Sequence, residues 1–68
     1  MIIHLIGDFI KLGQAIKAAN LVESGAEAKD VIQSGLVYVN GEQETRRGRK
    51  LVPGDVVEYD GETVEIVV

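Results

Sequence analysis

The spacing of hydrophobic residues changes from a helical period to a strand period at Gly35 of this 68-residue chain, and that change limits the fold more than any other feature. Between Leu12 and Gly35, apolar residues recur every three or four positions, which is the period of a helix with one buried face. After Gly35, apolar and polar residues alternate, which is the period of a half-buried strand. We therefore expect an α+β fold in which two short helices pack on a small, strongly bent antiparallel sheet.

Two helices are predicted before that point. The first lies between Gly13 and Asn20. The second starts at Ser24, whose hydroxyl can accept a backbone hydrogen bond while Glu27 reaches back, as in a capping box. Gly35 suits the left-handed position that commonly follows a helix. Both helices are too short to be stable alone, so tertiary packing must hold them. Their expected buried faces are Leu12, Ala15, Ile16 and Ala19 in the first helix and Ala28, Val31 and Ile32 in the second.

A tight turn is predicted at Asn40-Gly41, directly after the strand 36–39. If that turn has only two residues, Glu42 and Glu44 fall on the same face as the valines of the strand. Carboxylates are unfavourable neighbours for an apolar core. We therefore expect the returning strand to be irregular or to lie at the edge of the sheet.

The C-terminal hairpin, residues 55–67, has the clearest pattern. It follows a predicted type II turn over residues 52–55, and its own turn is Asp60-Gly61. Pairing of Tyr59 with Glu62 divides the hairpin into an apolar face and an acidic, solvated face. The apolar face would consist of Val57, Tyr59, Val64 and Ile66, and the solvated face of Val56, Glu58, Thr63 and Glu65.

Two short apolar runs, residues 2–6 and 9–12, lie on either side of Gly7-Asp8. This pattern favours an N-terminal hairpin over residues 2–12, although the second run can instead start the first helix. The sequence contains no internal repeat and no linker composition. We therefore expect residues 1–68 to form a single domain.

Positive charge is concentrated in one segment of an acidic chain. The net charge is −4, yet four of the seven basic residues fall within positions 46–50. Arginine predominates there, and its planar guanidinium suits bidentate contacts with phosphate. Lys17 and Lys29 fall on outward helix faces, and the backbone N–H groups after Ser24 offer an anion site. The candidate anion-binding residues are Lys17, Ser24, Gly25, Lys29, Arg46, Arg47, Arg49 and Lys50.

Two interpretations of the 46–50 segment are open at this point. In the first, the segment converges with the helix lysines, so that positive charge covers one side of the molecule and the acidic hairpin the other. In the second, it is a solvated loop held by weak ion pairs with Glu42 or Glu44.

The sequence contains no enzyme signature. It has no cysteine, and its only histidine, His4, cannot by itself form a metal cluster or activate a serine. We expect His4 to lie in a strand, where it faces a groove or is partly buried. No phosphate-binding loop is present, so we expect no catalytic site, cofactor or metal. The sequence also shows neither a signal-peptide pattern nor a membrane-spanning stretch, and we expect a soluble cytoplasmic protein.

The stretch LVESGAEAKDVIQSGLVYVNG, followed by ETRRGRKLVPGD, resembles the S4-type RNA-binding domain, particularly its short stand-alone bacterial members. The resemblance covers a motif core of about residues 12–59. It implies non-catalytic binding of structured RNA, such as ribosomal RNA, tRNA or a ribosomal particle, by the two helices and the adjoining loop. In that interpretation Lys17 and Lys29 contact phosphates, the helix start at Ser24-Gly25 approaches the RNA backbone, and residues 46–50 extend the surface.

The chain departs from the family pattern at two places. Many members have arginine where this chain has Gly25, and many open the first helix with Arg-Leu-Asp where this chain has Leu12-Gly13-Gln14. Both departures remove helix contacts, so the 46–50 segment should supply more of the affinity.

Two other functional hypotheses remain. The chain could be a protein-interaction module that docks on an acidic partner or through a strand edge, or a regulatory subunit of a separate enzyme. In the RNA-binding hypothesis, we expect the protein to act as a monomer.

Overall fold

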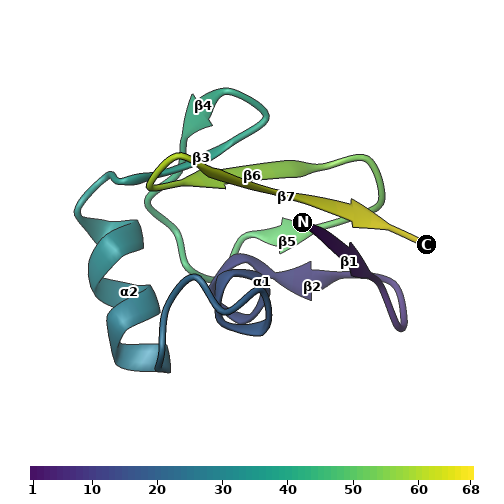
Figure 1. Cartoon of the computed structure of the whole chain (residues 1–68), viewed down its shortest axis with the longest axis horizontal. Helices are drawn as coiled ribbons and strands as arrows, with labels where there is room; N and C mark the ends of the chain where they lie inside the picture. Colours follow the sequence, from purple (N-terminus) through teal and green to yellow (C-terminus); the bar gives the residue numbers. More distant parts are fainter.

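The computed structural model describes residues 1–68, with helix α1 (Leu12–Ala18) and helix α2 (Gly25–Gln33) packed beside short strands (Figure 1). Both helices end with a left-handed residue, Asn20 (φ 63°) after α1 and Gly35 (φ 80°) after α2. In each case the following residue donates its N–H to a carbonyl in the last turn, at 3.0 and 3.1 Å respectively. Neither helix is long and apolar enough to cross a membrane.

The predicted apolar helix faces are buried, with Val31 only half-buried. Ser24 caps α2 as expected, because its Oγ accepts the Glu27 N–H at 3.1 Å. The Glu27 carboxylate, however, accepts the N–H of Glu23 at 2.6 Å, and not that of Ser24. The reciprocal half of the predicted capping box is therefore displaced by one residue.

Seven strands form two sheets. The order in the main sheet is β1-β7-β6-β3-β4, and β2 and β5 form a separate two-stranded ribbon (Figure 1). β1 runs parallel to β7, whereas all other pairs are antiparallel. The α+β class is confirmed, but the sheet is mixed, and its prediction as purely antiparallel is wrong. The strands are β1 (Ile2–His4), β2 (Ile10–Lys11), β3 (Val37–Val39), β4 (Glu42–Gln43), β5 (Lys50–Leu51), β6 (Val56–Tyr59) and β7 (Glu62–Val67).

The predicted N-terminal hairpin over residues 2–12 does not form. β1 pairs with β7 at the other end of the chain, and β2 pairs with β5. The physical reason is that β6 occupies only one side of β7, and an unpaired strand edge leaves backbone groups to be satisfied elsewhere. The alternative prediction, that the run 9–12 starts the first helix, is closer to the structure because β2 continues directly into α1.

The C-terminal hairpin has the predicted register, with Tyr59 opposite Glu62 and Val57 opposite Val64. Val57, Val64 and Ile66 are fully buried, and Tyr59 is half-buried. The residues predicted for the other face are all exposed. Local alternation and the Asp60-Gly61 turn were therefore sufficient to fix this element.

The turn at Asn40-Gly41 has two residues, and β4 lies at the sheet edge, as expected. The Asn40 side chain also fastens this turn to the type II turn: its Nδ2 donates to Asp55 Oδ1 and its Oδ1 accepts the Val56 N–H, both at 2.9 Å. Asp55 Oδ2 in turn accepts the Val52 N–H at 2.9 Å. Burial acts to raise the pKa of Asp55, but the hydrogen bonds from Asn40 and Val52 outweigh it, so the pKa is lowered. These hydrogen bonds join the two turns to each other. The segment between the turns leaves the main sheet after β4.

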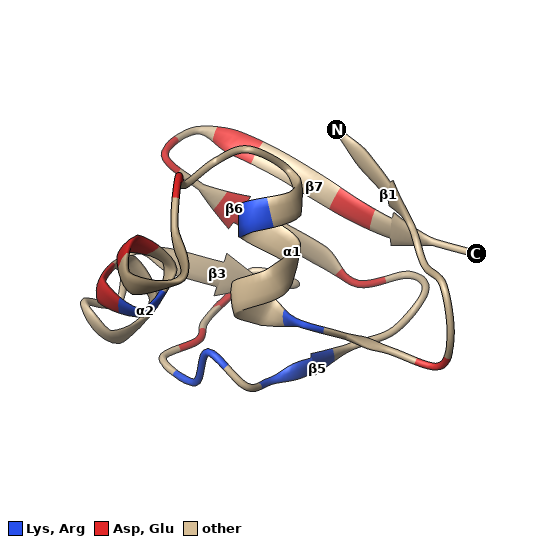
Figure 2. Cartoon of the chain, turned by 90° about the horizontal axis from the view of Figure 1, so that it is seen from below, with Lys and Arg blue, Asp and Glu red and all other residues tan.

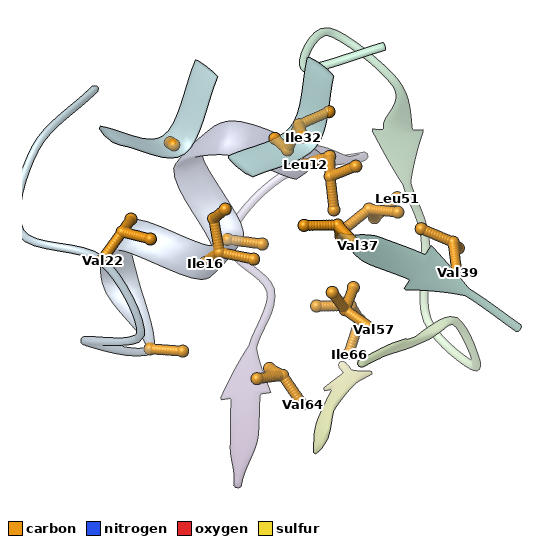
Figure 3. Close-up of a cluster of buried hydrophobic side chains, with 13 residues drawn as sticks. Leu12, Ile16, Val22, Ile32, Val37, Val39, Leu51, Val57, Val64 and Ile66 are labelled. Atoms are coloured by element: carbon orange, nitrogen blue, oxygen red, sulfur yellow. The ribbon is translucent and has the colours of Figure 1, made fainter. Parts of the chain in front are cut away.

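The hydrophobic core lies between the helices and the main sheet, and side chains from both meet there (Figure 3). Leu51 of β5 also belongs to it, so the core reaches the small ribbon. The thirteen core residues are Leu12, Ala15, Ile16, Ala19, Val22, Ala28, Ile32, Val37, Val39, Leu51, Val57, Val64 and Ile66.

Candidate nucleic-acid interface

Glu44 is the only charged residue that is buried, with 5% of its surface exposed. The two-residue turn at Asn40-Gly41 returns the chain so that the Glu44 N–H donates to the Val37 carbonyl at 3.0 Å. Glu44 therefore occupies the core-side position that the sequence pattern made unfavourable for a carboxylate. Its charge must be compensated by nearby donors, because burial of an unpaired charge is costly.

The compensation comes from the basic loop, which we define as residues 46–50. The Glu44 carboxylate accepts three hydrogen bonds from Arg46, through its backbone N–H (3.0 Å), Nε (3.0 Å) and Nη2 (2.9 Å). It also accepts the Thr45 N–H at 3.1 Å and Arg49 Nη1 at 3.0 Å. The hydrogen bonds from Arg46 outweigh the opposing effect of burial, and the pKa of Glu44 falls from 4.5 to about 2. Glu44 is therefore charged at neutral pH and fixes the shape of the loop.

The basic loop is also bonded to the start of α1. The first N–H groups of a helix have no partner within the helix. Here the Leu12 N–H donates to the Arg49 carbonyl at 2.8 Å, and the Gly13 N–H donates to the Arg47 carbonyl at 3.0 Å. The loop backbone thus caps α1, and the position of Arg47 is set relative to that helix.

A groove of about 350 Å³ lies between α1, the start of α2 and the basic loop. Three cationic residues, Lys11, Lys17 and Arg47, contribute to its lining. The other lining residues are small or neutral, and none is acidic. We call this the basic groove, and its complete lining is Lys11, Gly13, Gln14, Lys17, Gly25, Ala28, Arg47 and Gly48.

The structure brings three of the predicted site residues together in the basic groove: Lys17, Gly25 and Arg47. Lys29 is exposed on α2 but does not line the groove. The Ser24 hydroxyl is engaged as the α2 cap.

The remaining predicted residues lie in the basic loop with different partners. The Arg46 and Arg49 side chains both contact Glu44, and 74% and 28% of their respective surfaces stay exposed. The Lys50 ammonium lies 4.8 Å from the centre of the Phe9 ring. The ion-pair interpretation of the loop is therefore correct for Glu44, while most of the Arg46 surface is still available to a ligand.

Charge is distributed unevenly over the molecule. In Figure 2 the blue segments of the basic loop, β5 and the start of α1 lie together, with red segments on the chain that leads into the loop. β6 and β7 carry red segments on the opposite side, near one blue segment at the end of α1. A phosphate-bearing ligand would be attracted to the first side and repelled by the second.

Two residues important to this surface were not among the predicted site residues. Lys11 lines the basic groove because β2 pairs with β5, where Lys11 lies opposite Lys50. For Glu44 the sequence indicated both a core-facing register and a weak ion pair with the loop, but not that the two would occur together. Its position two residues before Arg46 was the available signal for a buried, paired carboxylate.

The helix pair, the two joined turns and the basic loop form one small α+β module with a cationic groove. The chain belongs to the S4 domain family, because residues 3–67 match the sequence pattern of that family. The resemblance seen in the motifs is thereby confirmed.

Among its relatives, the chain is 48% identical over 54 residues to the Bacillus subtilis protein RlbA, named a probable ribosome maturation protein; the match spans 79% of this chain and 76% of RlbA. It is 40% identical over 58 residues to Escherichia coli YbcJ, covering 85% of this chain and 83% of YbcJ. The solution structure of YbcJ, described as having an αL motif involved in RNA binding, matches with a TM-score of 0.76 and 35% identity over 98% of this chain and 86% of that one.

A third similarity is to the small ribosomal subunit protein uS4m of Schizosaccharomyces pombe. The two are 37% identical over 54 residues, which is 79% of this chain but 16% of uS4m. Only this module is therefore shared with the larger protein.

Proposed function

We propose that this protein is a non-catalytic module that binds structured RNA, namely ribosomal RNA, tRNA or a ribosomal particle, and that it acts as a monomer. The observation that carries the proposal is the basic groove, which three cationic residues and no acidic residue line in a protein of net charge −4. The names of the relatives support the same class of ligand, since RlbA is named for ribosome maturation and uS4m for the small ribosomal subunit.

Phosphate contacts in and around the basic groove would position the RNA. Lys11, Lys17 and Arg47 line the groove, and the exposed part of Arg46 and the Lys50 ammonium extend the cationic surface along the loop. Such contacts fix orientation but do not read sequence, so selectivity would come from the shape of the RNA. The acidic β6–β7 hairpin would disfavour binding through the opposite side.

Two lysine substitutions test the location of the site. Lys17 and Lys29 are both exposed helix residues, but only Lys17 lines the basic groove. We expect Lys17→Ala to weaken binding of purified ribosomal RNA several-fold and Lys29→Ala to have a smaller effect, as measured by filter binding. Equal effects of the two substitutions would contradict the placement of the site at the groove.

A second experiment separates RNA binding from the protein-interaction alternative. If RNA is the partner, ribosomal material that copurifies with the protein should be released by ribonuclease treatment. The proposal would be refuted if a copurified protein partner stays bound after ribonuclease treatment and the chain itself has no measurable affinity for purified ribosomal RNA.

A further inference from the structure

A second groove adjoins the basic groove and is lined mainly by apolar side chains. Its volume is about 410 Å³, and Phe9, Ile10 and Leu5 contribute to its walls. Gln14 lines both grooves, so the two grooves border each other at this side chain. No acidic residue lines the second groove. We call it the apolar groove.

Phe9 lies where the apolar groove meets the basic loop. The residue is 40% exposed, and the Lys50 Nζ lies 4.8 Å from its ring centroid. Pairing of β2 with β5 keeps Lys50 on the strand next to the one that follows Phe9. An exposed aromatic ring beside a cation combines the two features with which proteins bind unpaired nucleotides: a stacking surface for the base and a positive charge for the phosphate.

Gln14 adds a group that can contact a base edge. Its Oε1 accepts the Lys11 N–H at 3.3 Å, which leaves the two amide N–H donors free to hydrogen bond a ligand. Gln14, which lies on α1, is thus placed between the cations of the basic groove and the Phe9 ring of the apolar groove.

We propose that the apolar groove holds one unpaired nucleobase of the RNA whose phosphates occupy the basic groove. This inference rests on the proposed function and adds a site to it. Phe9 stacks on the base, Gln14 donates to its edge, and Lys50 contacts the adjoining phosphate. A nucleotide is favoured over an apolar protein segment because the apolar groove borders the cationic groove at Gln14 and carries an aromatic ring paired with a lysine.

The test compares two RNA probes, a fully paired duplex and the same duplex with one unpaired adenosine. Wild-type protein should prefer the second probe by roughly tenfold, within the range measured for a base stacked on an aromatic side chain. Phe9→Leu, which keeps an apolar side chain but removes the ring, should lose this preference and still bind the paired duplex. Tyr38→Leu is the matched control, because Tyr38 is 39% exposed and lines neither groove.

Each result has a defined meaning. If wild-type protein binds both probes equally, or if Phe9→Leu weakens both by the same factor, the nucleobase site is refuted while RNA binding stands. If wild-type protein binds neither probe nor ribosomal RNA, the proposed function itself fails. A third result would also overturn the proposal. If the wild-type protein self-associates in sedimentation but prefers neither probe, and Phe9→Leu abolishes the self-association, the groove binds a second copy of the chain.

Discussion

Replacing Glu44 with glutamine removes a negative charge from beneath the basic loop and should nevertheless weaken RNA binding. A glutamine side chain has one acceptor oxygen and one NH₂ group. If the oxygen keeps the bonds at the Oε2 position, the NH₂ group faces Arg46 Nη2 and Arg49 Nη1, which are themselves donors. The two arginines would then turn away, and the carbonyls of Arg47 and Arg49 that cap α1 would lose their fixed positions.

The size of the effect follows from the pKa of Glu44. A decrease from 4.5 to about 2 corresponds to roughly 3 kcal/mol in favour of the charged form. Solvent screens part of this, because 74% of the Arg46 side chain is exposed. We therefore expect Glu44→Gln to lower the free energy of unfolding by about 1–2 kcal/mol, which is a large share of the stability of so small a domain. A comparable disturbance of the loop, about 1 kcal/mol, would weaken RNA binding roughly fivefold.

The assay is urea unfolding followed by circular dichroism, together with filter binding to purified ribosomal RNA. Glu42→Gln is the matched control, because it removes the same charge from an exposed residue with no ion pair. Charge counting alone predicts that both substitutions strengthen RNA binding. If Glu44→Gln were as stable as Glu42→Gln and bound RNA equally well or more tightly, the organising role of Glu44 would be wrong.

Three further predictions follow from individual contacts. The folded-state pKa of Glu44, about 2, lies below its usual 4.5, so the stability that its charge contributes is complete above pH 4.5 and is lost as the pH falls from 4.5 towards 2. Between about pH 7 and pH 3, urea titrations should therefore show a larger loss of unfolding free energy for wild-type protein than for Glu44→Gln. Gly25→Arg should raise affinity for ribosomal RNA several-fold without loss of stability, because no atom lies within 4 Å of the added Cβ and the groove gains a cation; unchanged affinity would argue against the groove. Asn40→Ala should lower the unfolding free energy by about 2 kcal/mol in urea titrations, since it removes the bonds to Asp55 and the Val56 N–H; a loss below about 0.5 kcal/mol would show that the joined turns matter little.

The sequence predicted those parts of the fold whose signals are local. The buried helix faces follow a period of 3.6 residues, and the register of the C-terminal hairpin follows from alternation and the Asp60-Gly61 turn. The two-residue turn at Asn40-Gly41 was equally visible, and it correctly indicated that β4 lies at an edge. These elements need only a few consecutive residues to be recognised.

Apart from the capping box of α2, which is displaced by one residue, the errors concern contacts between distant parts of the chain. β1 pairs with a strand more than sixty positions away, with Ile2 opposite Glu65, and no pattern within residues 2–12 distinguishes that pairing from a local hairpin. The mixed character of the sheet follows from the same pairing. Lys11 was missed as a groove residue for a related reason, because only the β2–β5 pairing places it beside the loop.

The candidate site could be located from sequence, but its organisation could not. The cluster of basic residues and the family motifs both pointed to the 46–50 segment. The core-facing Glu44 carboxylate is stabilised by five hydrogen bonds, and these bonds make it the residue around which the loop is arranged. The geometry of the bonds follows from the loop conformation rather than from residue spacing.

The most direct test of the account is the salt dependence of ribosomal RNA binding. If about five cationic side chains neutralise phosphates, the slope of log K against log salt should be roughly −3.5 to −4.5 for the wild-type protein. Combined replacement of Lys11, Lys17 and Arg47 by alanine removes the cations of the basic groove and should make the slope shallower by about 2 to 3. A wild-type slope near zero, or an unchanged slope in the triple variant, would contradict the claim that RNA phosphates occupy the basic groove.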